Sequence, residues 1–197
     1  MCVCTAEPGK QRVGFKRRDD EKDGEARDRI YGKKGVGRAA VKMVVVVSTA
    51  KGLTIKLRYF EKPDIQRVME IEVESFLEGD ASLYLELYEE WPEGFLVAEY
   101  EGTVIGFAVL VLTLEGDGRI FAIAVDSRYR GRGVGRALLK LAFNTLRKRK
   151  IGFVRLEVRV SNNIAQRLYR SIGFMEIGFI PFYYKDGEGA IVMRKVM

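Results

Sequence analysis

Histidine is absent from this sequence of 197 residues. Its absence removes the commonest general base and every Ser-His or Cys-His nucleophile pair. Cys2 and Cys4 are the only cysteines, and two thiols without histidine partners do not make a zinc site by themselves. We therefore expect no metal, acid–base chemistry carried by carboxylate, tyrosine, lysine or water, and a reduced, cytoplasmic protein.

Long apolar runs are also missing. The longest near the N-terminus, Met43–Val47, is far short of the roughly 20 residues that span a bilayer. The polar start lacks the layout of a secretory signal, so we expect no membrane association. Asparagine and glutamine are scarce beside abundant Lys, Arg and Glu, a composition that favours a thermophilic source.

Positive charge is concentrated at the N-terminus. Residues 1–52 hold 13 Lys/Arg and 7 Asp/Glu, which leaves 21 and 20 for residues 53–197 out of a net charge of +7. From Lys10 to Lys42 the chain is charged and lacks apolar periodicity, so residues 1–52 are predicted to be a basic, disordered extension of one domain. Met43 is an alternative start under the hypothesis that residues 1–42 are an over-extended reading frame.

Apolar periodicity predicts the elements of the domain. The expected strands are 53–60, 95–100, 103–112, 119–125, 152–160, 174–179 and 189–196, with 119–125 buried on both faces. The expected helices are 65–76 with Asp64 as its N-cap, a short one around 83–88, 137–150, and one capped by Ser161 and stopped by Gly173. The order β-α-α-β-β-β-α-β-α-β-β indicates an α/β (α+β) fold, with a mixed central sheet of about seven strands flanked by helices.

Two similar glycine stretches invite comparison, GVGRAAVKM at 35–43 and GVGRALLKL at 133–141. The second follows a buried strand and opens an amphipathic helix, so backbone N–H groups and the helix dipole converge on one anion site. The glycines allow close backbone approach and the arginines add donors: Gly131, Gly133, Gly135, Arg128, Arg130, Arg132 and Arg136. The first copy follows no strand and is expected to bind nothing.

The string Arg130-x-x-Gly133-x-Gly135 after IFAIAV resembles the acetyl-CoA pyrophosphate loop of the GNAT superfamily of N-acetyltransferases. Residues 156–174, LEVRVSNNIAQRLYRSIGF, resemble a second signature of its protein N-terminal branch. Residues 182–195 resemble that branch's C-terminal hairpin, although Gly189 stands where the family usually has Asp. The resemblance covers residues 53–197 and is closest to archaeal N-alpha-acetyltransferases and ribosomal-protein N-terminal alanine acetyltransferases.

The resemblance implies the GNAT fold and acetyl transfer from acetyl-CoA to protein N-terminal α-amines, by direct attack in a ternary complex. It assigns Glu157 as general base and Tyr169, twelve residues later, as proton donor to the CoA sulfur. From spacing alone, Glu157 is typical of a solvated cross-strand charge and Tyr169 of a core residue. The implied contacts of acetyl-CoA are Ile123, Ala124, Val125, Arg130, Gly131, Arg132, Gly133, Val134, Gly135, Arg136, Asn162 and Tyr169.

The implied peptide substrate enters between the loop after the first helix and the final hairpin. Phe76, Leu77 and Glu78 border one side, where Glu78 is an alternative aid to deprotonation. Tyr183 and Tyr184 border the other, unless they only pack the hairpin. Expected partners are protein or peptide N-termini, ribosomal proteins among them, with weak ribosome or RNA contact through the basic arm. Alternatives are a small amine or lysine side chain as acceptor, or a non-catalytic acyl-CoA- or RNA-binding protein.

Overall fold

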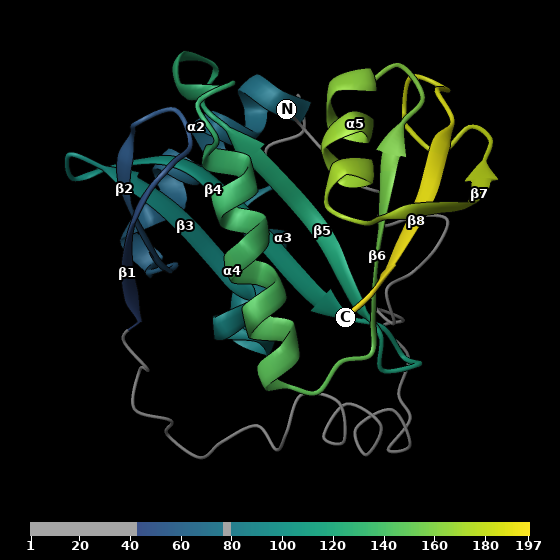
Figure 1. The fold of residues 1–197 in the computed structure, drawn as a ribbon, viewed down its shortest axis with the longest axis horizontal. Helices are drawn as coiled ribbons and strands as arrows, with labels where there is room; N and C mark the ends of the chain where they lie inside the picture. The colour runs from purple at the N-terminus through teal and green to yellow at the C-terminus, as the bar shows by residue number, and fades with distance from the viewer. Residues whose placement is uncertain (1–42, 77–79) are drawn as a thin grey trace.

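An open mixed sheet forms the centre of the molecule (Figure 1). This computed structural model describes residues 43–76 and 80–197. The strands are β1 (Val44–Ser48), β2 (Thr54–Tyr59), β3 (Phe95–Tyr100), β4 (Thr103–Leu112), β5 (Gly118–Val125), β6 (Phe153–Arg159), β7 (Met175–Ile180) and β8 (Ala190–Val196). They lie in the order β1-β2-β3-β4-β5-β6-β8-β7. Every neighbouring pair is antiparallel except β5 and β6, which are parallel.

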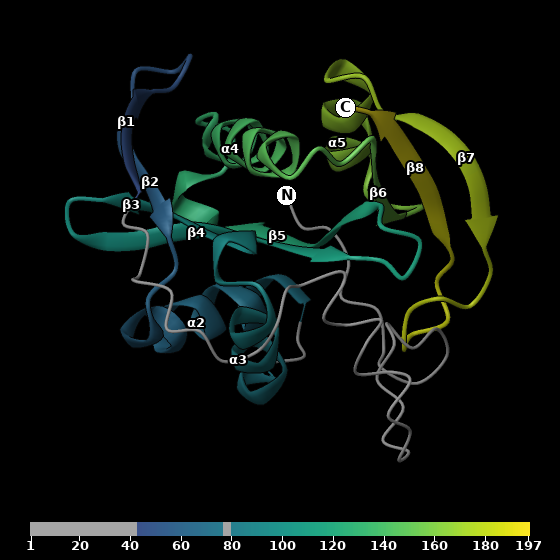
Figure 2. The same ribbon diagram turned by 90° about the horizontal axis from the view of Figure 1, so that it is seen from below.

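Helices cover both faces of this sheet, as Figure 2 shows. The helices α4 (Val134–Lys148) and α5 (Asn163–Ser171) lie on one face, and α2 (Ile65–Phe76) and α3 (Ala81–Glu90) lie on the other. This arrangement confirms the predicted α/β layering. Within residues 43–76 and 80–197, no helix is both long and apolar enough to cross a bilayer.

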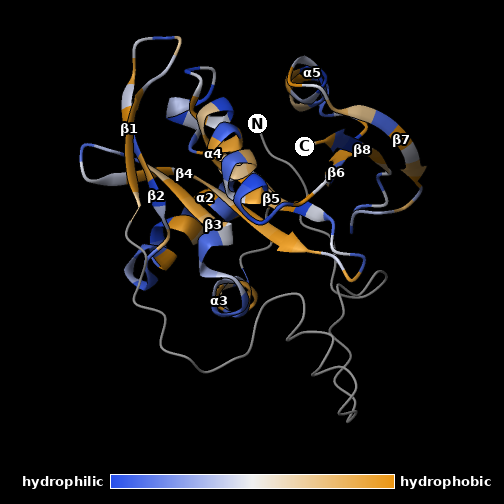
Figure 3. Cartoon of the chain, turned by 60° about the horizontal axis from the view of Figure 1, so that its bottom comes forward, coloured by the Kyte–Doolittle hydropathy of each residue, from blue (hydrophilic) through white to orange (hydrophobic). Residues whose placement is uncertain are grey.

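The sheet separates two apolar clusters. Leu138 of α4 and Ala165 of α5 belong to one cluster, and Val68 of α2 and Tyr84 of α3 to the other. The whole of β5 is buried, as its apolar run predicts, and Figure 3 shows β3, β4 and β5 as the hydrophobic centre. The close-packed core on both faces of these strands therefore holds the residues at their ends in fixed positions.

The N-terminal boundary of the domain differs from the sequence prediction. The strand β1 lies inside the predicted extension 1–52, and it pairs with β2 from Val44–Arg58 to Ser48–Thr54. Apolar alternation did not reveal it because its four consecutive valines are mostly exposed on an edge strand. The sheet therefore has eight strands in the described residues. Two expectations concern residues outside the described ranges: the disorder of residues 1–42, and the absence of ligand binding at the glycine stretch, of which residues 35–42 are not described.

Two helix starts also differ. The helix α4 begins at Val134 rather than Ala137, because Gly133 takes a left-handed conformation (φ +88°) and acts as its N-cap. The cap of α5 is Asn162 rather than Ser161: the Asn162 carboxamide oxygen accepts from the N–H of Ala165 at 3.1 Å. The predicted stop at Gly173 (φ +92°) is confirmed.

Candidate functional site

The strands β5 and β6 separate soon after they meet. Their register contains only the pairs Gly118–Val154 and Arg119–Arg155, and Figure 1 shows the two strands diverging from that point. Beyond Arg119, the edge of β5 that faces β6 leaves the ladder, while its other edge stays paired with β4 as far as Val125. The backbone groups along this open edge can accept an extended ligand as an added strand.

A β-bulge shapes the same strand. Opposite Val109 and Leu110 of β4 lie Ala122 and Ile120, so Phe121 is the extra residue on β5. Phe121 and Ala122 consequently both belong to the cluster beneath α2 and α3. Bulges of this kind re-aim side chains next to binding sites.

The loop after β5 turns sharply into the N-terminus of α4. Gly131 and Gly133 have φ values of +74° and +88°, which residues with a side chain rarely adopt. At Gly133 space is limiting too, because a Cβ would lie 3.1 Å from the Cβ of Thr49 in the β1–β2 turn. The first N–H groups of a 15-residue helix point out of this loop, an arrangement that binds anions.

A cavity of about 620 Å³ opens over this loop. The residues predicted to bind the cofactor that line it are Val125, Arg130, Gly131, Gly133, Val134, Gly135 and Arg136. The β1–β2 turn, Ser48 to Lys51, and Lys140 of α4 complete the basic part of the wall. Four lining residues are cationic and none is Asp or Glu, so the cavity favours a polyanionic ligand.

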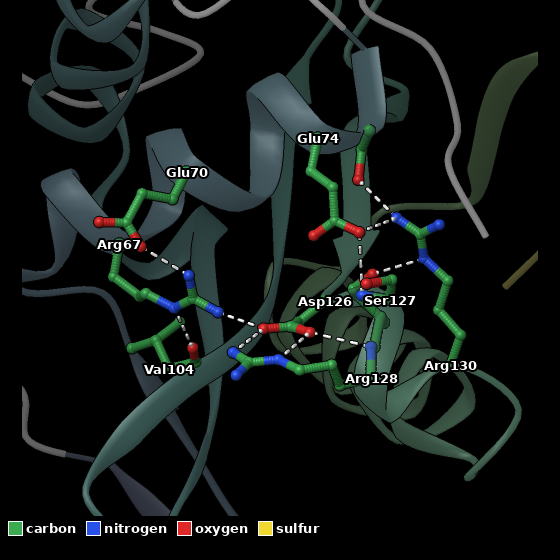
Figure 4. Close-up of polar contacts among 10 residues, drawn as sticks. Arg67, Glu70, Glu74, Val104, Asp126, Ser127, Arg128 and Arg130 are labelled. Carbon is green, nitrogen blue, oxygen red and sulfur yellow. Dashed lines mark hydrogen bonds and ion pairs between the residues drawn. The ribbon is translucent and has the colours of Figure 1, made fainter.

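Asp126, directly after β5, fixes the start of the loop (Figure 4). Its carboxylate is buried and accepts from Arg67 of α2, from the Arg128 backbone at 2.9 Å and from the Arg128 guanidinium at 2.7 Å. These bonds, led by the Arg128 side chain, lower the pKa of Asp126 to about 2. A carboxylate ionised at all physiological pH values thus joins the loop to α2.

Arg130 makes a second connection between the loop and α2. Its Nε donates to the Val125 carbonyl at 2.8 Å, and its Nη2 donates to Ser75 at 3.2 Å and to Glu74 at 3.3 Å. Glu74 also accepts from the backbone N–H of Ser127 at 3.2 Å. The Arg130 side chain therefore connects the loop to α2, and Arg130 also lines the cavity.

Glu157 lies on β6 and is only 2% exposed. Arg119 of β5 donates from Nε to Glu157 Oε2 at 2.8 Å, and from Nη2 to the Tyr183 hydroxyl at 2.7 Å. The interpretation of Glu157 as a solvated cross-strand charge is wrong, because it is buried in an ion pair. The structure thereby joins a predicted base to a predicted substrate-side tyrosine.

Comparison with known proteins agrees with this geometry. Residues 65–174 match the Acetyltransferase (GNAT) family. The chain belongs to the GNAT acetyltransferase family. An uncharacterised N-acetyltransferase of Methanocaldococcus jannaschii is 40% identical over 141 residues, covering 71% of this chain and 90% of the relative.

Two further relatives point to the same branch. An N-alpha-acetyltransferase of Sulfurisphaera tokodaii is 31% identical over 156 residues, covering 73% of this chain and 93% of the relative. The crystal structure of Ard1 from Thermoplasma volcanium superposes with a TM-score of 0.70 at 37% identity, covering 73% of this chain and 97% of that one. The predicted GNAT fold is confirmed.

Other residues expected to contact the GNAT cosubstrate are not part of the cavity wall. Ile123 and Ala124 are buried within β5. Arg132 lies over the Tyr129 ring, with its Cζ 5.7 Å from the centroid, and the side chain of Asn162 caps α5. Tyr169 is 0% exposed and packs edge-on against Phe174, with ring centroids 5.6 Å apart.

The substrate side of the GNAT site is partly described. Phe76 is the last residue of α2 and packs against the apolar cluster that contains Val68 and Tyr84, whereas Leu77 and Glu78 lie outside the described residues. Tyr184 is buried beneath the Arg159 guanidinium, whose Cζ lies 3.8 Å from the ring centroid. Arg159 also binds Asp186 at 2.7 Å and Glu188 at 2.9 Å, so the acidic residues of the hairpin motif attach it to β6.

Sequence reasoning missed three contributors: Arg119, Asp126 and the β1–β2 turn. Arg119 and Asp126 flank the apolar run IFAIAV, and a charge at either end of a buried strand is a usable signal because buried charges require partners. The turn carried no such signal, since only the folded sheet brings it over Gly133.

Proposed function

We propose that this chain transfers the acetyl group of acetyl-CoA to the N-terminal α-amine of proteins, by direct attack in a ternary complex. The observation that carries the proposal is the opening between β5 and β6. The basic cavity lies at the α4 end of this opening, and the buried carboxylate of Glu157 lies on β6. The Sulfurisphaera tokodaii relative, an N-alpha-acetyltransferase, supports the same acceptor.

The residues at the cavity fit acetyl-CoA. The N–H groups of Val134 and Gly135 and the cations Lys51, Arg136 and Lys140 suit its phosphates. The open edge of β5 suits its amide-containing arm, which pairs with backbone as a strand does. When bound, acetyl-CoA supplies an activated acyl thioester.

The side chains on the strands supply the acid–base chemistry in this proposal. A peptide α-amine titrates near about 8, so a carboxylate acting directly or through water suffices to accept its proton. Glu157 is the proposed base, and backbone N–H groups at Ile123 to Val125 are the proposed donors to the developing oxyanion. Tyr169 on α5 stays the predicted proton donor to the leaving sulfur.

The final hairpin favours a peptide acceptor over a small amine. Tyr183 and Tyr184 meet edge to face with centroids 5.1 Å apart. Arg119 donates a hydrogen bond to the Tyr183 hydroxyl, and the Arg159 guanidinium lies over the Tyr184 ring. A rigid aromatic edge beside the base suits the main chain of an extended peptide. Transfer to a lysine side chain or a small amine is the second candidate, favoured only by the substitution of Gly189 for the usual Asp.

Acetyl transfer to a peptide panel tests the proposal. The panel begins with Ser, Ala, Met-Leu or Met-Glu, and each peptide has a twin with a blocked N-terminus and one free lysine. We expect acetylation of the free α-amines and none of the blocked twins. Equal rates on both would establish the lysine alternative instead.

A matched pair of variants tests the base. Glu157→Gln should lower kcat about 100-fold or more while the KM for acetyl-CoA stays within about twofold. Glu89→Gln, on the exposed face of α3, is the control and should match the wild type. An unchanged rate in Glu157→Gln would remove Glu157 from the mechanism.

The partner and the compartment are finer parts of the same proposal. Ribosomal proteins are proposed substrates, with the cytoplasm as the place where they meet the enzyme. The basic residues 1–42 would add salt-sensitive ribosome or RNA contact through counterion release. A purely RNA-binding or acyl-CoA-binding role predicts binding without any acetylated product, which the peptide assay detects directly.

A further inference from the structure

We propose that Arg119 is a positioning residue of this site, which holds the Glu157 base as an oriented anion and couples it to Tyr183 at the substrate edge. The inference rests on the proposed function, because it assigns a role within the same reaction. Arg119 lies on β5 and is not part of the loop after β5 that is proposed to bind the cosubstrate.

The geometry places one guanidinium between two elements. Arg119 is the second residue of β5 and is 4% exposed. Its Nε donates to Glu157 Oε2 on β6 at 2.8 Å, and its Nη2 donates to the Tyr183 hydroxyl at 2.7 Å. An arginine fork fixes two acceptors in one plane, so both partners take their orientation from the same group.

Burial explains why a cation is needed here. A carboxylate at 2% exposure loses its hydration and, without a partner, favours the neutral form, which cannot accept a proton. The charge-assisted bond from Arg119 offsets this desolvation and fixes the direction of the Glu157 carboxylate. An ion pair makes a carboxylate a weaker base, but a peptide α-amine requires only a weak base. A protonated carboxyl group could not accept the proton at all.

The ion pair also distinguishes the two oxygens of Glu157. Oε2 is committed to Arg119, whereas among the described residues Oε1 has only the longer contact with Arg155 Nε, at 3.8 Å. Arg155 is half-exposed, so this contact is weaker. We assign Oε1 as the oxygen that accepts the proton from the amine or from a bridging water.

The second bond connects the base to substrate binding. Tyr183 is partly exposed and stands against Tyr184 on the hairpin. A peptide main chain that binds the Tyr183 hydroxyl therefore acts on the same guanidinium that orients Glu157. Substrate contact and base orientation are coupled through Arg119, 38 residues before Glu157 and 64 before Tyr183 in the chain.

Substitution of Arg119 tests this with readouts beyond activity loss. In Arg119→Gln we expect kcat to fall about 100-fold, and the acid limb of the kcat/KM pH profile to move to higher pH because the unpaired carboxylate takes up a proton more readily. Arg119→Lys should recover part of kcat, since it keeps the charge and loses the fork. The control is Arg194→Gln, a half-exposed arginine of β8 paired with Asp117.

Tyr183→Phe tests the coupling and does not depend on how Arg119→Gln folds. Alone it should raise the KM for peptide several-fold, and in the Arg119→Lys background it should add little, because the two groups act through one bond network. Thermal unfolding and acetyl-CoA binding of each variant report the integrity of the fold.

The outcomes separate two kinds of failure. If the wild type and Arg194→Gln acetylate peptides and the Arg119 variants match them in kcat and pH profile, the inference is overturned and the proposed function stands. Additive effects of Arg119→Lys and Tyr183→Phe overturn the coupling. If the wild type acetylates no peptide, the proposed function fails and this inference fails with it.

Discussion

At the scale of single residues, the two candidate catalytic side chains occupy different environments. Glu157 is a buried charge held by a buried partner, an arrangement that is costly unless it serves orientation or chemistry. Tyr169 is a buried aromatic among apolar neighbours, and packing alone accounts for its ring. The hydroxyl of Tyr169 therefore needs an experiment that separates chemistry from packing.

Tyr169→Phe provides that experiment because the ring and its contact with Phe174 remain. We expect kcat to fall about 100-fold and the free energy of unfolding to change by less than about 1.5 kcal/mol. Tyr84→Phe, a tyrosine 1% exposed in the cluster on the other face, should change stability similarly and leave kcat intact. Steady-state kinetics and denaturant unfolding of both variants separate chemistry from packing. If Tyr169→Phe and Tyr84→Phe had equal kcat values, Tyr169 would be a core residue only.

Gly133 gives a second prediction at this scale. Gly133→Ala should destabilise the loop by about 1–2 kcal/mol through its left-handed backbone, with further crowding against Thr49, and should raise the KM for acetyl-CoA. Gly152→Ala is the control, because nothing lies within 4 Å of the added Cβ. Equal thermal stability and equal KM in the two variants would contradict the geometry assigned to Gly133.

At the scale of elements, α2 and the loop after β5 form one unit. Arg67 reaches Asp126 at the start of the loop, and Arg130 reaches back to Glu74 and Ser75 at the end of α2 (Figure 4). The end of α2 borders the predicted peptide entrance, whereas the loop borders the cavity proposed to bind acetyl-CoA. The same ion pairs thus hold the end of α2 and the loop after β5 in fixed positions relative to each other.

Asp126 makes this unit sensitive to acid. Its pKa is lowered to about 2 by the Arg128 bonds, against about 3.9 in an unfolded chain. Its contribution to the free energy of unfolding is complete above about pH 4 and is lost as pH falls through about 2, because over this interval the unfolded state binds a proton that the folded state does not. Asp126→Asn should unfold about 2 kcal/mol more easily at pH 7, and this difference should shrink towards pH 2 in thermal melts. A constant difference across that range would contradict the assignment.

At the scale of the whole molecule, the β1–β2 hairpin forms one wall of the cavity proposed to bind acetyl-CoA. Val45, Val47 and the turn from Ser48 to Lys51 line the cavity opposite α4. The strand β1 also covers the edge of β2, which would otherwise present unpaired backbone. Residues 44–51 thus contribute both to the sheet and to the wall of the cavity.

Two truncations separate the basic arm from this hairpin. Deleting residues 1–42 should leave peptide acetylation within about twofold of the wild type, since the sheet and cavity remain. Deleting residues 1–52 should raise the KM for acetyl-CoA roughly tenfold, equivalent to about 1.4 kcal/mol, and lower thermal stability. If both truncations behave alike, β1 is not part of the binding site.

The sequence by itself determined the order of the elements from β2 onward and the family, and it predicted an anion-binding loop. Each of these is local: period-2 and 3.6-residue patterns report which face is buried, and Arg130-x-x-Gly133-x-Gly135 fits a loop between strand and helix. The thermophilic source and the cytoplasmic setting stay predictions.

Only the tertiary structure decided which residues meet. Arg119, Glu157 and Tyr183 belong to different elements and become one cluster because β5 and β6 part just after Arg119. Thr49 and Gly133 meet because the β1–β2 turn lies over the loop. Burial of Glu157 likewise depends on its neighbours in space, so an alternating strand pattern could not distinguish a solvated charge from a buried base.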